Sequence, residues 1–207
     1  MMQILKSLID PRRAQLVSFD TLLKGHRVVL RMPCPDDWKS WLHLRETGRQ
    51  YLEQWEPKWP DNALSYSFFC SLQQRQWRDW RDGKAYAFSI LLQEDPSPKL
   101  IGGITLSDIR MLPTKKGTVG YWMGQPHSGK GYMSEALGLV CEFAHKELGL
   151  QKIEASCLPG NEPSKAVLKR AGFEHKDFAR SYLQINGRDE DHLLWSKDYT
   201  KQTSPTD

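Results

Sequence analysis

The chain has 207 residues, 39% of them hydrophobic, which is enough for one substantial core but hardly for two independent ones. Its four cysteines lie far apart, without the paired spacing of metal sites, so we expect core thiols of a reducing compartment and no bound metal. No apolar run has the length of a signal peptide or a membrane span, which excludes a membrane partner and favours a cytoplasmic protein.

The formal net charge is +4, and the first 27 residues supply +3 of it, with five basic and two acidic side chains. We predict that residues 1–26 form a basic extension in front of the folded domain. Two interpretations of this segment are open: a solvated surface, as most charged runs are, or an arm that contacts a nucleic-acid-rich particle.

In the first half of the chain, the short β-branched run "RVVLRM" predicts a strand at residues 27–32. Apolar residues then recur at helical spacing over residues 34–55 and 65–83, which predicts two helices joined by a proline-rich loop. Three β-rich runs follow at residues 85–94, 100–109 and 117–124, and the prolines and lysines between them mark the turns of an antiparallel meander.

Helical periodicity returns in the stripe Met133, Ala136, Leu137, Val140, Cys141, Ala144 and Leu148. "KIEASCL" predicts a strand, "NEPSKAVLKRAG" a short helix, and the dipeptide Asn186-Gly187 a hairpin over residues 173–198. This order indicates an α+β fold with a twisted, mostly antiparallel sheet of about seven strands flanked by helices. We expect one domain over residues 27–198 and a flexible tail over residues 199–207.

The segment "GQPHSGKG", residues 124–131, lies between a predicted strand and a predicted helix. Glycine allows a ligand to approach the backbone, and the free N–H groups and dipole at a helix start favour anions, so the loop is a candidate phosphate site. A simple strand-to-helix turn would use glycine in the same way. The letters match neither a Walker loop nor a dinucleotide fingerprint, because Lys130 precedes Gly131 and Ser134 stands where a third glycine is needed.

The loop resembles that of the GNAT acetyltransferase family, Arg/Gln-x-x-Gly-x-Gly/Ala, although Pro126 stands at its first position. The resemblance implies acetyl-CoA as cosubstrate, without a metal, and a diphosphate held by the loop and the following helix. It assigns cofactor binding to Met123, Gly124, His127, Ser128, Gly129, Lys130, Gly131, Tyr132, Met133, Asn161 and Ser164.

Further segments, "PGNEPS", "LKRAGF", "YLQING" and "LRETGRQYLEQWEPKWP", are similar to the ribosomal-protein-alanine N-acetyltransferase branch of that family. The resemblance covers residues 27–197 and implies catalytic roles for Ser164, as a donor to the departing sulfur, and for a backbone N–H near Met123, as the oxyanion donor. For Asn161, helix capping is an alternative or additional role, and for Ser164 the alternative is an ordinary solvent-facing residue of the helix. Glu154 is either a catalytic group that holds a water molecule or a solvent-facing residue of its strand.

On the substrate side, the resemblance points to Trp55, Glu56 and Trp59, in a stiff aromatic and proline loop, and to Tyr182 and Asn186 in the hairpin. Core packing explains the same loop equally well. For the adjacent Asp191 and His192 we expect structural hydrogen bonds rather than acid–base or metal chemistry. Relatives in this branch commonly have a glutamate where this chain has Lys176, so the usual candidate for the general base is missing.

The resemblance therefore implies transfer of an acetyl group from acetyl-CoA to the N-terminal α-amine of a ribosomal protein that begins with alanine or serine. Two alternatives stay open. One is an acetyltransferase for a small amine or a lysine side chain, and the other is a non-catalytic acetyl-CoA-binding module that docks on ribosomal particles.

Overall fold

A computed structural model describes residues 17–94 and 96–200, and eight strands in these ranges form one sheet. The strands are β1 (Leu22–Lys24), β2 (Val28–Arg31), β3 (Tyr86–Leu92), β4 (Lys99–Arg110), β5 (Lys116–Met123), β6 (Lys152–Cys157), β7 (Glu174–Ile185) and β8 (Arg188–Asp198). The α+β prediction is confirmed. Seven strands were predicted, and the eighth, which was not, is β1.

The helices are α1 (Trp38–Thr47), α2 (Arg49–Glu53), α3 (Tyr66–Arg81), α4 (Tyr132–Lys146) and α5 (Glu162–Arg170), with short 3-10 helices η3 (Pro35–Asp37) and η4 (Gln125–His127). The single helix expected over residues 34–55 is divided, because the chain leaves helical geometry at Gly48, between α1 and α2. No helix within the described ranges is long and apolar enough to cross a membrane.

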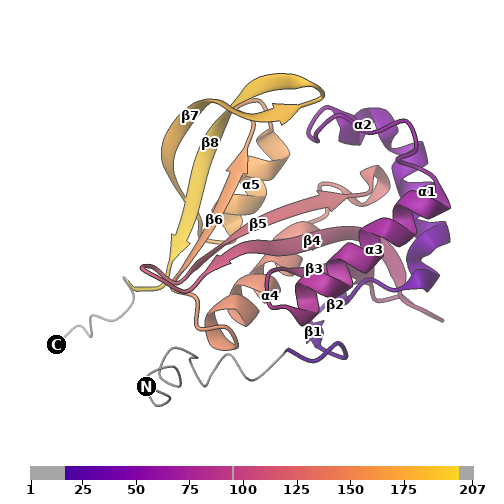
Figure 1. The fold of residues 1–207 in the computed structure, drawn as a ribbon, viewed down its shortest axis with the longest axis horizontal. Helices are drawn as coiled ribbons and strands as arrows, with labels where there is room; N and C mark the ends of the chain where they lie inside the picture. The colour runs from indigo at the N-terminus through magenta and orange to yellow at the C-terminus, as the bar shows by residue number, and fades with distance from the viewer. Residues whose placement is uncertain (1–16, 95, 201–207) are drawn as a thin grey trace, which may run out of the picture.

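The strand order is β1-β2-β3-β4-β5-β6-β8-β7, and every pair is antiparallel except β5 with β6. The parallel pair requires a crossover connection, which α4 supplies. β5 and β6 are paired only from Lys116 to Thr118 and from Lys152 to Glu154, and from there the two strands diverge (Figure 1). The sheet is therefore open between these two strands.

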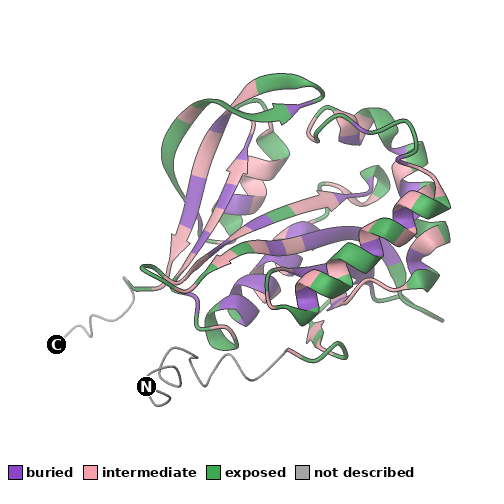
Figure 2. Cartoon of the chain, viewed as in Figure 1, coloured by how far each residue is buried: buried purple, intermediate pink, exposed green. Residues whose placement is uncertain are grey.

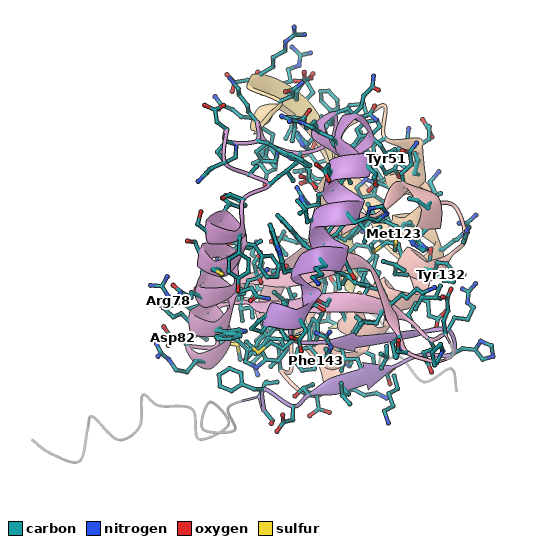
Figure 3. The ribbon with its side chains drawn as sticks, turned by 90° about the vertical axis from the view of Figure 1, so that its right-hand side faces the viewer. Tyr51, Arg78, Asp82, Met123, Tyr132 and Phe143 are labelled. Atoms are coloured by element: carbon teal, nitrogen blue, oxygen red, sulfur yellow. The ribbon has the colours of Figure 1, made fainter. Side chains whose placement is uncertain are left out.

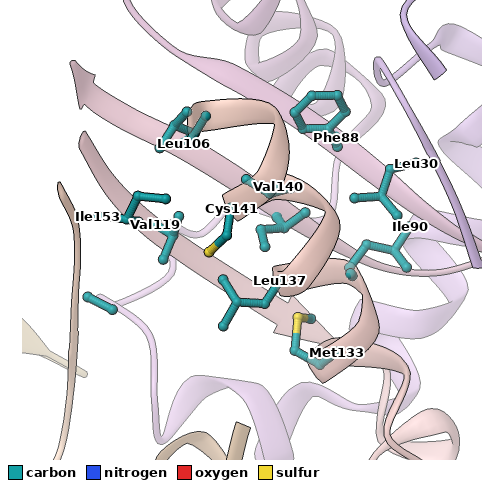
Figure 4. Close-up of a cluster of buried hydrophobic side chains, with 14 of the residues drawn as sticks. Leu30, Phe88, Ile90, Leu106, Val119, Met133, Leu137, Val140, Cys141 and Ile153 are labelled. Atoms are coloured by element: carbon teal, nitrogen blue, oxygen red, sulfur yellow. The ribbon is translucent and has the colours of Figure 1, made fainter. Parts of the chain in front are cut away.

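The main core lies between α4 and the sheet. The predicted stripe of α4 is confirmed, because Met133, Leu137, Val140 and Cys141 are buried against side chains of β2 to β6 (Figure 4). On the opposite face, α1 and α3 pack on the sheet through a smaller aromatic cluster that includes Trp41 and Phe69 (Figure 1). Buried residues accordingly line the inner sides of the helices, while most of β7 is exposed (Figure 2).

The two ends of the domain differ from the expected boundaries. β1 lies inside the segment predicted as an extension, and it pairs with β2 along all three of its residues. At the other end, the ring of Tyr199 stacks on His145 with centroids 4.1 Å apart, so the ordered chain reaches past residue 198. The rest of the predicted extension and tail, residues 1–16 and 201–207, lies outside the described residues.

The hairpin predicted at Asn186-Gly187 is confirmed. Both residues have positive φ, 47° and 79°, as a two-residue turn between twisted strands requires. Farther from the turn, β7 carries a bulge between Ala179 and Leu183, where Ser181 also has positive φ and its N–H donates to Asp191 Oδ1 at 2.9 Å. Bulges re-aim side chains, and this one determines how Tyr182 projects from the strand.

Candidate active site

The opening between β5 and β6 exposes backbone groups of β5. Gly124 N–H donates to Ile101 O, toward β4, at 2.8 Å, and on an antiparallel strand such groups alternate in direction. The N–H of the preceding residue, Met123, is therefore directed toward the β6 side, into the opening. Its side chain is buried in the core, so the backbone at Met123 is held in place. This geometry suits the predicted role of Met123 as an oxyanion donor.

The segment of residues 124–131, here called the glycine loop, leads from this opening into α4. Gly129 and Gly131 have φ of +74° and +83°, a region that only glycine enters without strain. Gly131 is the N-cap of α4, and no side chain caps the helix there. A Cβ added at Gly129 would meet no atom within 4 Å. The first turn of α4 thus presents its backbone N–H groups beside open space, the arrangement in which helix starts bind anions.

The surroundings of the loop are basic. Burial and the neighbouring Lys130 lower the pKa of His127, so its imidazole is mostly neutral near pH 7. Lys130 is exposed, and Lys99 lies close enough to influence His127 although it is paired with Glu94 at 2.9 Å. In the first turn of α4, the hydroxyl of Ser134 is buried and has no hydrogen-bond partner within the described part of the chain.

A second element fixes the loop from the other side. The hydroxyl of Tyr51, in the middle of α2, donates to Ser128 Oγ at 2.8 Å. Figure 3 looks onto this end of the molecule, where Tyr51, Met123 and Tyr132 come from α2, β5 and the start of α4. The glycine loop before α4 is therefore in contact with α2. The segment that follows α2 is the tryptophan-rich loop, which contains Trp55, Glu56 and Trp59.

The structure brings Ser164 to the opening from α5. Its backbone N–H donates to Asn161 Oδ1 at 3.0 Å, so the capping role of Asn161 is confirmed. Its hydroxyl lies 2.9 Å from the hydroxyl of Tyr121 on β5. Burial raises the pKa of Tyr121 well above its usual value, so its phenol stays protonated and remains able to donate. Tyr121 is a candidate site residue that the sequence did not reveal.

Glu154 lies on the face of the sheet opposite α4, because it alternates with Ile153 and Ala155, whose side chains are in the core. Its two carboxylate oxygens accept hydrogen bonds from Lys116 and Lys152, each at 2.8 Å. Burial raises the pKa of Glu154, but these two lysines outweigh it and hold the pKa below its usual range. A carboxylate held in this way is a weak base.

A pocket of about 390 Å³ opens on this same face. Its lining comes from β5, β6, β7 and β8 and includes Thr118, Glu154, Lys176, Tyr182 and Ser196. Lys176, which replaces the glutamate expected from relatives, thus shares the pocket with Glu154, and its ammonium is paired with Glu174. Tyr182 is half exposed and meets the ring of His192 edge to face at 5.7 Å.

Asp191 and His192 do not bond to each other. Asp191 accepts from Ser181 in the bulge, and His192 Nδ1 lies 2.9 Å from Glu190 O, so both make the structural hydrogen bonds that we expected. No group of three or more His, Cys, Asp or Glu side chains that could hold a metal occurs within residues 17–94 and 96–200.

The tryptophan-rich loop is fixed by contacts within the protein. Glu56 pairs with Arg45 of α1 through both oxygens and also accepts from Trp59 Nε1 at 2.7 Å. Trp59 is buried, and the Arg45 guanidinium lies 4.3 Å from its ring centroid. The Glu56 carboxylate is therefore already neutralised, which argues against a role for Glu56 in binding the ammonium group of a substrate. Trp55 is half-buried and remains the better candidate for a substrate contact.

The backbone of the same loop reaches the hairpin. Asn186 N–H donates to Glu56 O at 2.9 Å, so the two segments predicted to contact substrate are joined to each other. A second cavity of about 360 Å³ borders this junction at Asn186, and its lining also includes Gln54, Leu158 and Glu190. The structure thus places the predicted substrate residues on one side of the opening and the glycine loop with Ser164 on the other.

Comparison with known proteins shows the family to which the chain belongs. Residues 27–174 match the family described as Acetyltransferase (GNAT) domain. The chain is 33% identical over 177 residues to the probable N-acetyltransferase YjcK of Bacillus subtilis, covering 84% of this chain and 94% of the relative. It is 30% identical over 175 residues to the [ribosomal protein uS5]-alanine N-acetyltransferase of Escherichia coli, covering 83% and 88%.

Among solved structures, RimJ of Mycobacterium smegmatis in complex with CoA-disulfide superimposes with a TM-score of 0.82 at 25% identity, covering 90% of this chain and 91% of that one. The match over residues 27–174 includes the open β5–β6 pair, the glycine loop and α4. On this evidence the chain belongs to the GNAT acetyltransferase family.

Proposed function

We propose that this acetyltransferase uses acetyl-CoA to modify the N-terminal α-amine of a protein, and that the substrate is a ribosomal protein beginning with alanine or serine. The observation that carries the proposal is the opening between β5 and β6, with an anion cradle and Ser164 on the α4 side and a pocket on the other. The names of the Escherichia coli relative and of the Mycobacterium smegmatis neighbour support a ribosomal substrate and CoA binding.

The residues present suit acetyl-CoA. The open space at Gly129 lies beside the first turn of α4, where a diphosphate would meet its backbone N–H groups, and His127, Lys130 and Lys99 add donors and charge. The pantetheine arm would then run along the opening toward Ser164. Acetyl-CoA would supply an activated acetyl thioester at the end of this arm, beside Met123.

The residues on the opposite face favour an α-amine over a lysine side chain as acceptor. Glu154 is held by two lysines and Lys176 is a cation, so neither is suited to remove a proton from a strongly basic amine. An α-amino group has a pKa of about 7.7–8.0 against about 10.4 for lysine, a gap of roughly 2.5 that corresponds to about 3.4 kcal/mol of deprotonation. An α-amine thus needs little help from a general base.

In the proposed reaction, the neutral amine attacks the thioester carbonyl, the carbon–sulfur bond breaks, and CoA leaves as a thiolate, which then takes up a proton from water. The Met123 N–H stabilises the charge that develops on the carbonyl oxygen. The Ser164 hydroxyl, oriented by Tyr121, donates to the departing sulfur. The proton lost by the amine leaves through water in the pocket that Glu154 and Tyr182 line.

Mass spectrometry of ribosomal proteins from cells with and without this protein tests the substrate. We expect one ribosomal protein to lose its N-terminal acetyl group when the protein is absent. Unchanged protein N-termini together with altered acetylation of small amines would contradict the proposal.

The contact between Tyr51 and Ser128 gives a prediction for acetyl-CoA affinity. Tyr51→Phe removes one neutral hydrogen bond that fixes the glycine loop, typically worth about 1 kcal/mol, so we expect acetyl-CoA to bind about fivefold more weakly. Isothermal titration calorimetry measures the change. An unaltered affinity would show that the loop keeps its shape without α2.

A second prediction concerns Glu154. Loss of a general base typically lowers turnover by about 100-fold or more, but a carboxylate shared by two lysines is not suited to that role. We therefore expect Glu154→Gln to lower kcat only about threefold at pH 7.5, far short of that general-base loss. Steady-state kinetics with a peptide acceptor test this, and a loss of about 100-fold would make Glu154 the base after all.

A further inference from the structure

Arg27, immediately before β2, contacts the glycine loop although about 100 residues separate them in sequence. Its Nη1 donates to Lys130 O at 3.0 Å, and its Nε donates to Glu135 Oε2, also at 3.0 Å. Its backbone N–H donates to the other oxygen of Glu135 at 2.7 Å. The guanidinium also lies 4.9 Å from the ring centroid of Tyr132. Arg27 therefore contacts the end of the glycine loop at Lys130 and the first turn of α4 at Tyr132 and Glu135.

The bond to Lys130 O sets the orientation of a peptide group. Because the peptide unit is planar and trans, its C=O and its N–H point in opposite directions. With Lys130 O held toward Arg27, the N–H of Gly131 is directed away from Arg27 and remains free of this contact. A terminal nitrogen of Arg27 lies 3.3 Å from the position that a Cβ of Gly131 would take, so the guanidinium lies directly beside this glycine, whose φ is +83°.

The contact between Arg27 and Glu135 offsets the negative charge in the first turn of α4. A carboxylate near a helix N-terminus stabilises the helix, but it repels any anion that binds at the same helix start. Burial raises the pKa of Glu135, and the bonds from Arg27 and Val28 outweigh it and lower the pKa, so the group stays ionised. Both of its oxygens accept from residues 27 and 28, which neutralises this carboxylate and holds it at β2.

We infer that Arg27 is a positioning residue for the diphosphate of acetyl-CoA. Arg27 orients the Gly131 N–H toward the diphosphate site at the start of α4, and it neutralises Glu135. The inference rests on the proposed cofactor site at the glycine loop. Arg27 acts through the geometry of its fork rather than through charge alone. A lysine has a single nitrogen and cannot replace the separate bonds to Lys130 O and Glu135.

The test compares two acetyl donors. S-acetylpantetheine carries the same thioester arm as acetyl-CoA but has no diphosphate. For Arg27→Ala we expect calorimetry to show acetyl-CoA bound about 10- to 100-fold more weakly, the loss typical of charge-assisted hydrogen bonds. Turnover with saturating S-acetylpantetheine should equal that of the wild type. Arg27→Lys should recover less than half of the lost affinity on a logarithmic scale.

Arg81→Ala is the matched control, because Arg81 also pairs with a carboxylate but lies exposed at the far end of α3, and this variant should bind acetyl-CoA like the wild type. Unchanged acetyl-CoA affinity in Arg27→Ala would overturn the inference, as would equal losses with both donors or full recovery in Arg27→Lys. If the wild type itself binds acetyl-CoA no better than S-acetylpantetheine, the proposed cofactor site fails, and the inference fails with it.

Discussion

Gly129→Val is expected to abolish detectable binding of acetyl-CoA while leaving the protein folded. Gly129 has a φ of +74°, and its Cβ position faces open space beside the start of α4. A valine there places a branched side chain where the diphosphate must approach, and it also strains the loop by about 1–2 kcal/mol. We expect calorimetry to find affinity weakened at least about 1000-fold, equivalent to roughly 4 kcal/mol of lost binding.

The strain and the steric block can be separated with a second glycine. Gly149, just after α4, has a similar φ of +66° and likewise no atom within 4 Å of its Cβ position, but it lies at the opposite end of the helix. Gly149→Val should lower the thermal midpoint about as much as Gly129→Val and should bind acetyl-CoA normally. A folded Gly129→Val variant with wild-type affinity would remove the loop from the cofactor site.

Ser164→Ala is expected to lower kcat about 100-fold, the usual loss when one positioned donor to a developing negative charge is removed. Binding of acetyl-CoA should change less than about twofold, because the donor gains strength only as charge develops on the sulfur. The cap of α5 survives the substitution, since Asn161 accepts from the backbone N–H of residue 164 and not from its side chain.

Tyr121→Phe provides the companion measurement. Its hydroxyl lies 2.9 Å from Ser164 Oγ, so removing it should lower kcat by a smaller factor, about tenfold, through loss of the orientation of Ser164. Pre-steady-state kinetics with a peptide acceptor would separate the chemical step from product release. A Ser164→Ala variant that turns over as fast as the wild type would exclude Ser164 from the mechanism.

The sequence predicts the parts of this site that local patterns determine. The glycine loop, the stripe of α4 and the cap at Asn161 each follow from residues within a few positions of one another, because helix periodicity, caps and tight turns are local properties. The hairpin turn at Asn186-Gly187 is of the same kind, since both residues tolerate positive φ.

Contacts between distant segments could not be predicted in this way. Tyr121 meets Ser164 only because α4 returns the chain to lie parallel to β5. Arg27 reaches Lys130 because β2 lies under the start of α4, and neither residue carries a local signal for the other. Glu56 is a substrate-side candidate by sequence, yet Arg45 on α1 neutralises it. β1 has only three residues, too few for a periodic pattern.

Acetylation of two matched peptides tests the central claim most directly. Both contain one internal lysine and begin with alanine, and in one of them the N-terminus is blocked. We predict a single acetyl group on the α-amine of the free peptide, none on the blocked peptide, and a kcat/KM that rises with pH through the pKa of the amine, about 7.7–8.0. Acetylation of the lysine in the blocked peptide, at a rate equal to or above that of the free α-amine, would contradict the account.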